Sequence, residues 1–175
     1  MLKLHARHYV TGEPIPDELV AKLEAARIFN NGFKTVEYLS CALVDQALHA
    51  TDSATLKDLD LNAFEAEKLQ ELGMPQGMAM RHRLPHFQHL FSSSAYAAAY
   101  YVYLWAEVLD ADAFDAFIEA GDPFDAATAV RLRECIYASG GTSEPGEAYR
   151  AFRGRDPSIR PMLKKKLGLT GAEAD

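Results

Sequence analysis

The sequence has few of the features that mark secreted, disulfide-bonded or membrane-spanning proteins. It contains two cysteines, Cys41 and Cys135, and each lies within an apolar helical pattern, so we expect reduced core side chains rather than a disulfide. No stretch approaches the ~20 consecutive apolar residues that span a bilayer. The N-terminal sequence also lacks the apolar region and small-residue cleavage site of a signal peptide. These absences predict a cytoplasmic protein with no membrane partner.

Basic residues are in the minority. The 18 Lys and Arg residues face 25 Asp and Glu residues, a formal net charge of −7, and such an acidic chain is a poor candidate for binding nucleic acid. Hydrophobic residues make up 49% and charged residues 25% of the chain, which is ordinary globular composition. We expect one domain with its own core over residues 1–169 and a frayed tail over residues 170–175.

β-Branched residues are sparse and never alternate with polar ones, whereas Ala, Leu, Glu and Lys are common. This pattern predicts an all-α fold. Residues 2–10 are expected to end a helix, a second helix begins at Pro16-Asp17, and residues 73–84 form an extended loop. Further helices are expected at residues 33–50, 61–72, 86–91, 97–120, 125–138, 144–154 and 158–167. The helix at 97–120 is apolar nearly all round, so its first turns should be buried.

Histidines and tyrosines concentrate in residues 81–107. Tyr96, Tyr100 and Tyr103 follow the i, i+4, i+7 spacing that places side chains on one helical face. A buried phenol needs a hydrogen-bond partner. This stripe is therefore either core packing with satisfied hydroxyls or the lining of a cavity, and the residues alone leave both possibilities open.

Three histidines precede the tyrosines at the same spacing, at His82, His86 and His89. An i, i+4 histidine pair can hold zinc, but Pro85 disfavours a helix that runs from His82 to His86. No Cys, Asp or Glu lies nearby in the sequence to complete a ligand set. We therefore predict no metal site here; a histidine among tyrosines is better suited to donate hydrogen bonds to a substrate or a developing oxyanion.

Several catalytic signatures are missing, among them H-E-x-x-H, G-x-S-x-G, a phosphate-binding glycine loop and paired C-x-x-C motifs. Three carboxylates after the aromatic stretch are either an acid pair or, as we favour, part of a solvated or salt-bridged face: Glu107, Asp110 and Asp112. Four arginines could each bind a carboxylate of a ligand or of the protein itself: Arg81, Arg83, Arg153 and Arg155.

Four stretches occur in an order that resembles a known family: ARHYVTGEPIPDELV, FNNGFKTVEYLSCALVDQALH, HFQHLFSSSAYAAAYYVYLWAEVLDADAF and ASGGTSEPGEAYRAFRGRDPSIRPML. They are similar to the C-terminal part of the thimet-oligopeptidase-like zinc metallopeptidases, in particular the bacterial peptidyl-dipeptidase and oligopeptidase A group. The resemblance covers residues 5–169. It implies an irregular, almost wholly helical zincin-type fold with a channel for short, unstructured peptides. In the family, the zinc-binding H-E-x-x-H helix lies N-terminal to these stretches, so this chain resembles a C-terminal portion that lacks it.

The resemblance implies roles for individual residues. His89 matches the family histidine that contacts the peptide, and Tyr96 matches the tyrosine of the following loop. Tyr100 and Tyr103 match a helical pair that binds substrate and stabilises the oxyanion. We therefore expect Tyr100 and Tyr103 to be catalytic, and His89 and Tyr96 to bind substrate.

Arg83 is a further candidate for substrate binding, because Arg81 or Arg83 could hold the terminal carboxylate of a peptide. By resemblance, the complete enzyme uses zinc to hydrolyse short peptides, whereas this chain alone is expected to hold no metal and to be inactive. Two alternatives stay open. The chain could be a non-catalytic helical interaction module that self-associates through its exposed surface, or one half of a split peptidase whose N-terminal zinc-binding portion is a separate partner.

The sequence departs from the family where the loop before the tyrosine is usually rich in glycine. Here that loop is Ser92-Ser93-Ser94-Ala95, and Ala99 precedes Tyr100. Because Ser and Ala disfavour positive φ angles, we expect a stiffer loop than in the glycine-rich family members.

Overall fold

The computed structural model describes residues 2–169, and these form the all-α fold that the sequence predicts. The helices are α1 (Leu2–His5), α2 (Asp17–Ile28), α3 (Asn31–Ala50), α4 (Ser53–Leu56), α5 (Leu61–Glu71), α6 (Gln88–Phe91), α7 (Val102–Glu119), α8 (Ala126–Leu132), α9 (Pro145–Arg153) and α10 (Arg160–Leu167). Two 3₁₀ turns, η1 (Leu84–His86) and η2 (Ser94–Tyr96), and a π-helical turn, η3 (Arg133–Tyr137), accompany them. Within this described part, extended pairing is limited to an isolated antiparallel bridge between Arg7 and Pro14.

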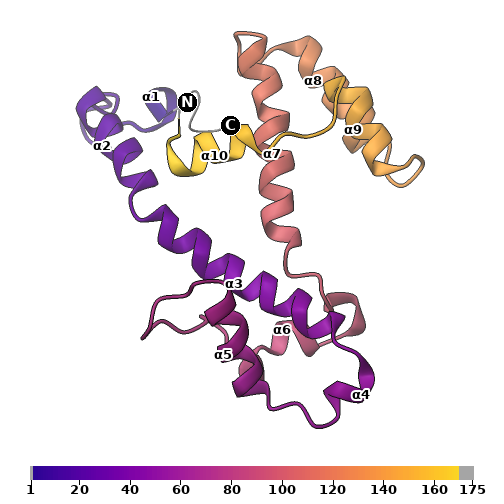
Figure 1. Ribbon diagram of the computed structural model, residues 1–175. Helices are drawn as coiled ribbons and strands as arrows, with labels where there is room; N and C mark the ends of the chain where they lie inside the picture. Colours follow the sequence, from indigo (N-terminus) through magenta and orange to yellow (C-terminus); the bar gives the residue numbers. More distant parts are fainter. Residues whose placement is uncertain (1, 170–175) are drawn as a thin grey trace.

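Two long helices, α3 and α7, set the shape of the molecule (Figure 1). They approach each other near the C-terminal half of α3 and the start of α7, and they diverge toward the opposite end. There α10 lies between them and packs against both. The elements α5, η1 and α6 gather beside the C-terminal half of α3, whereas α8, η3 and α9 lie at the far end of α7.

The larger core lies where α3 packs against α5 and the segment that leads to α7. Its buried members are Cys41, Ala42, Val44, Leu48, Phe64, Leu69, Met80, Leu84, Phe87, Leu90 and Tyr100. Helix α3 presents an apolar face because residues such as Cys41, Val44 and Leu48 recur at helical spacing. Asp60 caps α5 through its side chain, and Gly73, with φ of +72°, allows the chain to turn after it.

A second, smaller core joins α7 to α10. Val108 and Ala111 of α7 are buried together with Met162 of α10. Two ion pairs flank this contact: Lys165 with Asp110, and Lys166 with Glu107. The salt-bridged face predicted for these two carboxylates is confirmed.

The third carboxylate, Asp112, is fully buried between α7 and α9. It accepts hydrogen bonds from the Tyr149 hydroxyl (2.6 Å) and from Nη2 of Arg155 (2.7 Å). Arg153 also contacts it and forms two 2.8 Å hydrogen bonds to Glu119. Burial alone would raise the pKa of the Asp112 carboxyl, but these hydrogen bonds and positive charges outweigh burial and hold that pKa below its ordinary value. Both arginines of the AFRGRDP motif thus pair with the protein's own carboxylates.

The prediction for residues 97–120 is wrong at the start of the helix. Helix α7 begins at Val102, because Ala98 adopts φ of +55°, a left-handed conformation that cannot continue a right-handed helix. The expectation of buried first turns is also wrong: Tyr101 and Trp105 are about half exposed. The buried contact between α7 and α10 starts further along α7.

Two other predicted helices are interrupted. The segment 86–91 is divided at Phe87, whose ψ of 62° separates η1 from α6. The segment 125–138 begins as α8 and continues as the π-helical turn η3. In both places the hydrophobic spacing indicated a helix, but it did not indicate the change in backbone hydrogen bonding.

Three further predictions concern the cysteines, membrane-spanning helices and the C-terminal tail. Both cysteines are free, with Cys41 buried and Cys135 only partly so, which confirms reduced side chains but places only the first in the core. In the described residues 2–169, no helix has the length and apolar character needed to cross a membrane. The tail 170–175, predicted to fray, lies outside the described residues.

Candidate functional site

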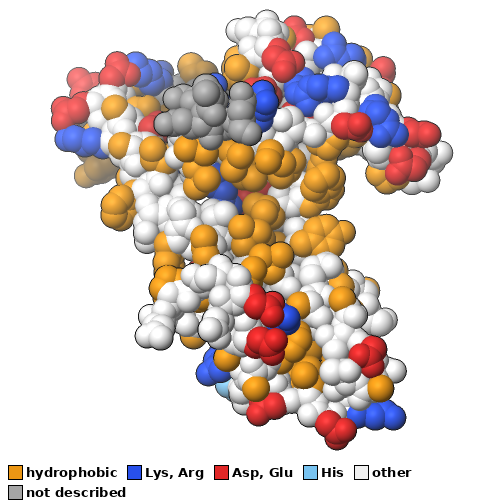
Figure 2. Space-filling view, viewed as in Figure 1, with side chains coloured by type: hydrophobic (Ala, Val, Ile, Leu, Met, Phe, Trp, Pro, Cys, Tyr) orange, Lys and Arg blue, Asp and Glu red, His pale blue; other side chains and the backbone are white. Residues whose placement is uncertain are grey.

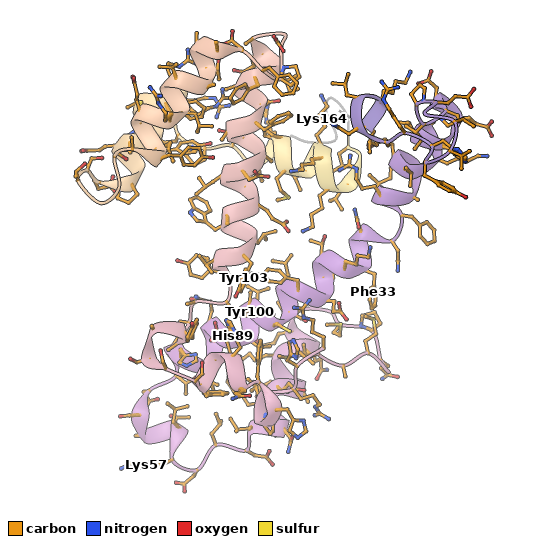
Figure 3. All side chains as sticks on the ribbon, turned by 180° about the vertical axis from the view of Figure 1, so that it is seen from behind. Phe33, Lys57, His89, Tyr100, Tyr103 and Lys164 are labelled. Carbon is orange, nitrogen blue, oxygen red and sulfur yellow. The ribbon has the colours of Figure 1, made fainter. Side chains whose placement is uncertain are left out.

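The histidine- and tyrosine-rich region lines a cavity of about 520 Å³. Its walls come from α3, the loop before η1, the η1–α6 segment, and the start of α7 with the residues that precede it. The lining residues are Tyr38, Arg81, His82, His86, Phe87, Gln88, His89, Tyr100 and Tyr103. Figure 3 shows His89, Tyr100 and Tyr103 near one another, where the start of α7 meets the larger core.

His89 lies at the centre of the aromatic group. Its Nε2 atom is 3.4 Å from the Tyr103 hydroxyl oxygen, and its ring centroid is 4.8 Å from that of Tyr96 and 5.6 Å from that of Tyr100. Tyr96 and Tyr103 are about half exposed, so a ligand can approach both phenols. The structure thus brings four of the predicted site residues together.

Tyr100 differs from its neighbours because its side chain is only 6% exposed. Its hydroxyl accepts a 2.8 Å hydrogen bond from Nη2 of Arg81. The ring packs edge-on against Phe87 and stacks with Tyr38. A hydroxyl that accepts one hydrogen bond can still donate its own proton. The sequence left two possibilities open for this tyrosine, core packing and the lining of a cavity. Tyr100 does both: its ring is packed, its hydroxyl has a hydrogen-bond partner, and it lines the cavity.

Side chains of α3 hold the segment that precedes α7. The Asp45 carboxylate accepts hydrogen bonds from the amides of Ala98 (3.1 Å) and Tyr100 (3.0 Å). Gln46 donates a hydrogen bond to the Ala98 carbonyl. The Tyr38 hydroxyl donates to the Tyr100 carbonyl, and burial raises the pKa of the Tyr38 phenol above its ordinary value.

The serine-rich loop forms the turn η2. The Ser93 hydroxyl accepts a hydrogen bond from the Ala95 amide, a local contact that favours this compact turn. The residue with positive φ in the following segment is Ala98 rather than Ala99.

Arg83 is placed differently from the other predicted site residues. Its Nε atom donates a 2.9 Å hydrogen bond to Glu65 of α5, and Glu65 also accepts from the Leu84 amide over 2.8 Å. Glu65 is buried, at 2% exposure. Arg83 does not line the cavity, whereas Arg81 does.

The three histidines do not form a metal-binding group. Over residues 2–169, the structure places no set of three or more His, Cys, Asp or Glu side chains where they could hold a metal ion. His82, His86 and His89 all line the cavity, but no carboxylate or thiol lines it with them. The donors present in the described residues do not fit zinc, and no chemical step can be assigned to a metal held by them.

Sequence reasoning missed two residues whose side chains bind the backbone of the segments that carry the site. Asp45 and Glu65 are buried carboxylates, at 0% and 2% exposure. A signal for the first was present, since Asp45 interrupts the apolar run CALVDQAL on a helix whose core face is otherwise apolar. Which backbone amides it binds could not be read from the sequence, because the bonded residues lie 53 and 55 positions away.

Comparison with known proteins places the chain in a protein family. The family model described as Peptidase family M3 matches residues 1–167. The chain is 36% identical over 166 residues to the dipeptidyl carboxypeptidase of Escherichia coli, covering 93% of this chain and 24% of that protein. It is 39% identical over 167 residues to the oligopeptidase A of the same organism, covering 94% of this chain and 24% of that protein.

A plant relative is similar over the same portion. The organellar oligopeptidase A of Arabidopsis thaliana is 40% identical over 175 residues, which cover 97% of this chain and 21% of that protein. The chain thus spans about a quarter or less of the length of these relatives.

Proposed function

The chain belongs to peptidase family M3, and we propose that it supplies the substrate-binding wall of a metallopeptidase that hydrolyses short peptides, of the oligopeptidase or peptidyl-dipeptidase kind. The observation that carries this proposal is the convergence of His89, Tyr100 and Tyr103 on one cavity of about 520 Å³. Imidazole and phenol groups donate hydrogen bonds to carbonyl oxygens, and an extended peptide presents a carbonyl at every residue.

Tyr100 and Tyr103 are the proposed catalytic residues. As a peptide bond is attacked, negative charge grows on its carbonyl oxygen, and a donor aimed at that oxygen stabilises the transition state by about 3–4 kcal/mol. Arg81 donates to the Tyr100 hydroxyl, which polarises that hydroxyl and strengthens it as a donor. Tyr103 is about half exposed and so is open to the ligand, and its hydroxyl oxygen lies 3.4 Å from Nε2 of His89.

His89 and Tyr96 are the proposed substrate-binding residues. Their ring centroids are 4.8 Å apart and Tyr96 is about half exposed, so the pair can bracket the peptide beside the scissile bond. A terminal carboxylate needs a cation, and Arg81 is favoured over Arg83 for this role. Arg81 lines the cavity, while Arg83 is paired with Glu65.

The metal of the active peptidase is proposed to come from outside these residues. The family depends on zinc in general, and the described residues do not offer a ligand set. The zinc-binding part is then either a further portion of the same enzyme or a second chain in a split peptidase. In both cases this chain alone is inactive, and its own contribution is to bind and orient the peptide.

A second candidate is a non-catalytic helical interaction module, and one observation favours it. Apolar side chains line a groove of about 350 Å³ between α3, α7 and α10, among them Leu39, Tyr101 and Trp105. Figure 2 shows hydrophobic side chains gathered over the middle of this face. The same surface would also serve to dock the zinc-binding portion of the peptidase or a second copy of this chain, since exposed apolar patches mark interaction sites.

Peptide binding tests the proposed function. The chain is titrated with an internally quenched peptide of about six residues, and binding is followed by calorimetry. Tyr103→Phe removes one hydroxyl donor and should weaken binding about five- to tenfold, because one neutral hydrogen bond contributes about 1 kcal/mol. Tyr137→Phe makes the same change at an exposed tyrosine of η3 and should leave binding unchanged.

The outcomes separate the candidates. If no short peptide binds, or if both variants weaken binding equally, the substrate-binding role is wrong; an oligomer that binds no peptide favours the interaction module. The same peptide also tests for hydrolysis with added zinc and with a chelator. Cleavage by the chain alone that the chelator abolishes would contradict the proposed external source of the metal.

A further inference from the structure

Asp45 of α3 is a fully buried carboxylate. Its side chain is 0% exposed, and it is not among the residues that line the histidine- and tyrosine-rich cavity. Both of its oxygens are used: Oδ1 accepts from the Ala98 amide and Oδ2 from the Tyr100 amide. Its neighbour one helical turn away, His49, places Nδ1 at 2.8 Å from Oδ1. The carboxylate therefore binds the backbone of one turn, the one that contains Ala98 and Tyr100.

That turn is strained without its partners. Ala98 has φ of +55°, a conformation that L-residues avoid because Cβ approaches the backbone carbonyl. In this bent conformation the amides of Ala98 and Tyr100 both donate to the Asp45 carboxylate, as in anion-binding backbone turns. Gln46 binds the Ala98 carbonyl between them. The side chains of α3 therefore compensate for the unfavourable backbone angle.

The turn also decides where Tyr100 points. Tyr100 is the second residue after Ala98, and its amide is fixed by Asp45. Its carbonyl is held by Tyr38, and its ring lies between Tyr38 and Phe87. A different φ at Ala98 would rotate the following peptide units and move the phenol away from Arg81.

We propose that Asp45 is a positioning residue, whose carboxylate holds Ala98 in the left-handed conformation and thereby sets the direction in which the Tyr100 phenol enters the cavity. It touches no substrate. The consequence for peptide binding rests on the proposed function, whereas the consequence for the geometry of Tyr100 does not. Asp45→Asn keeps the shape of the side chain but presents an amide group to one of the two backbone N–H groups, so at least one hydrogen bond is lost.

The test compares Asp45→Asn with a matched variant, Asp112→Asn. Asp112 is equally buried, at 0% exposure, but it lies in the α7–α9 cluster with Tyr149 and the two arginines. Tyrosines are labelled with fluorine for ¹⁹F NMR, and amide exchange is measured by NMR. In Asp45→Asn the Tyr100 resonance should shift and its amide should exchange at least tenfold faster, while the amides of α9 remain protected. In Asp112→Asn the Tyr100 signals should stay as in the wild type.

Ala98→Gly tests whether the effect of Asp45→Asn on Tyr100 can be reversed. If Asp45 only stabilised the fold, this change would not restore the Tyr100 resonance. Glycine adopts positive φ without strain, so adding this change to Asp45→Asn should return the Tyr100 resonance toward its wild-type position. The same addition to Asp112→Asn should change nothing further at Tyr100. If Asp45→Asn alone does not fold, the double variant is compared with Ala98→Gly. A double variant that still fails to fold, while Asp112→Asn folds, overturns the positioning role.

The remaining outcomes separate this inference from the proposed function. An unmoved Tyr100 resonance in folded Asp45→Asn overturns the inference, whatever the peptide does. A shifted resonance that glycine restores supports it, even if the wild-type chain binds no peptide and the proposed function fails. Where peptide binding is observed, Asp45→Asn should weaken it about tenfold and the glycine rescue should recover most of that loss.

Discussion

Arg81 and Tyr100 are joined by a 2.8 Å hydrogen bond from Nη2 of the guanidinium to the phenol oxygen. The bond links the loop before η1 to the segment before α7, 19 residues apart in the chain. Both residues line the same cavity, so the contact places a positive charge and a phenol side by side at the site that we propose for peptide binding.

Arg81→Ala removes that donor from Tyr100. We expect peptide binding to weaken about tenfold, because a charge-assisted hydrogen bond is lost and the phenol is no longer held. The free energy of unfolding should fall by less than about 1 kcal/mol, since Arg81 is solvent-exposed and exposed charged contacts contribute little. Calorimetric titration and urea unfolding measure the two effects. Arg131→Ala, at an exposed position on α8, is the control and should leave both unchanged.

Glu65→Gln tests whether the contact between Arg83 and Glu65 stabilises the fold. The buried Glu65 carboxylate binds both Arg83 and the Leu84 amide. Its loss should lower the free energy of unfolding by about 2–3 kcal/mol, because buried hydrogen bonds to a charged group are replaced by weaker ones. Glu67→Gln, the same change on the exposed side of α5, should cost less than about 0.5 kcal/mol. Equal effects of the two variants in urea unfolding would show that the Glu65 contacts contribute little.

Acid should destabilise the α7–α9 cluster through Asp112. The pKa of Asp112 lies below the 3.8 of an ordinary aspartate, so its stabilising contribution is fully present above about pH 4 and is lost as the pH falls through the folded-state pKa. In that range the unfolded chain binds more protons than the folded one. Asp112→Asn should therefore lower stability at pH 7 and flatten the fall in stability below pH 4. Urea unfolding between pH 7 and pH 3 checks this, and Asp58→Asn, at an exposed aspartate, should keep the wild-type pH profile.

Gly154 separates the two arginines that reach Asp112. Its φ is +74°, and an added Cβ would meet nothing within 4 Å, so Gly154→Ala tests backbone strain alone. We expect a loss of about 1 kcal/mol in the free energy of unfolding. Gly32→Ala is matched to it, because it too has open space but lies in α3 without positive φ; alanine should be neutral or stabilising there. Thermal unfolding that ranks the two variants in the opposite order would contradict this account.

The sequence determined helices such as α3 and α5 because their signals are local. Apolar spacing over a few turns indicated α3 and α5, and residues that break helices marked their ends, as Asn30 does with φ of 59° before α3. The sequence also determined the family, since the four stretches that resemble it lie within residues 1–167, which the model of peptidase family M3 matches.

Only the tertiary structure decided how the site is held. Asp45 meets Ala98 and Tyr100 across more than 50 residues, and Arg83 meets Glu65 across 18. Such pairs form because buried charged and polar groups need hydrogen-bond partners once the helices pack together. The local sequence pattern does not predict which residue the partner will be. Helix α7 begins at Val102, after the turn at Ala98 that the Asp45 carboxylate contacts from α3. We therefore expect the direction of the Tyr100 phenol to depend on how the helices pack as well as on its own segment.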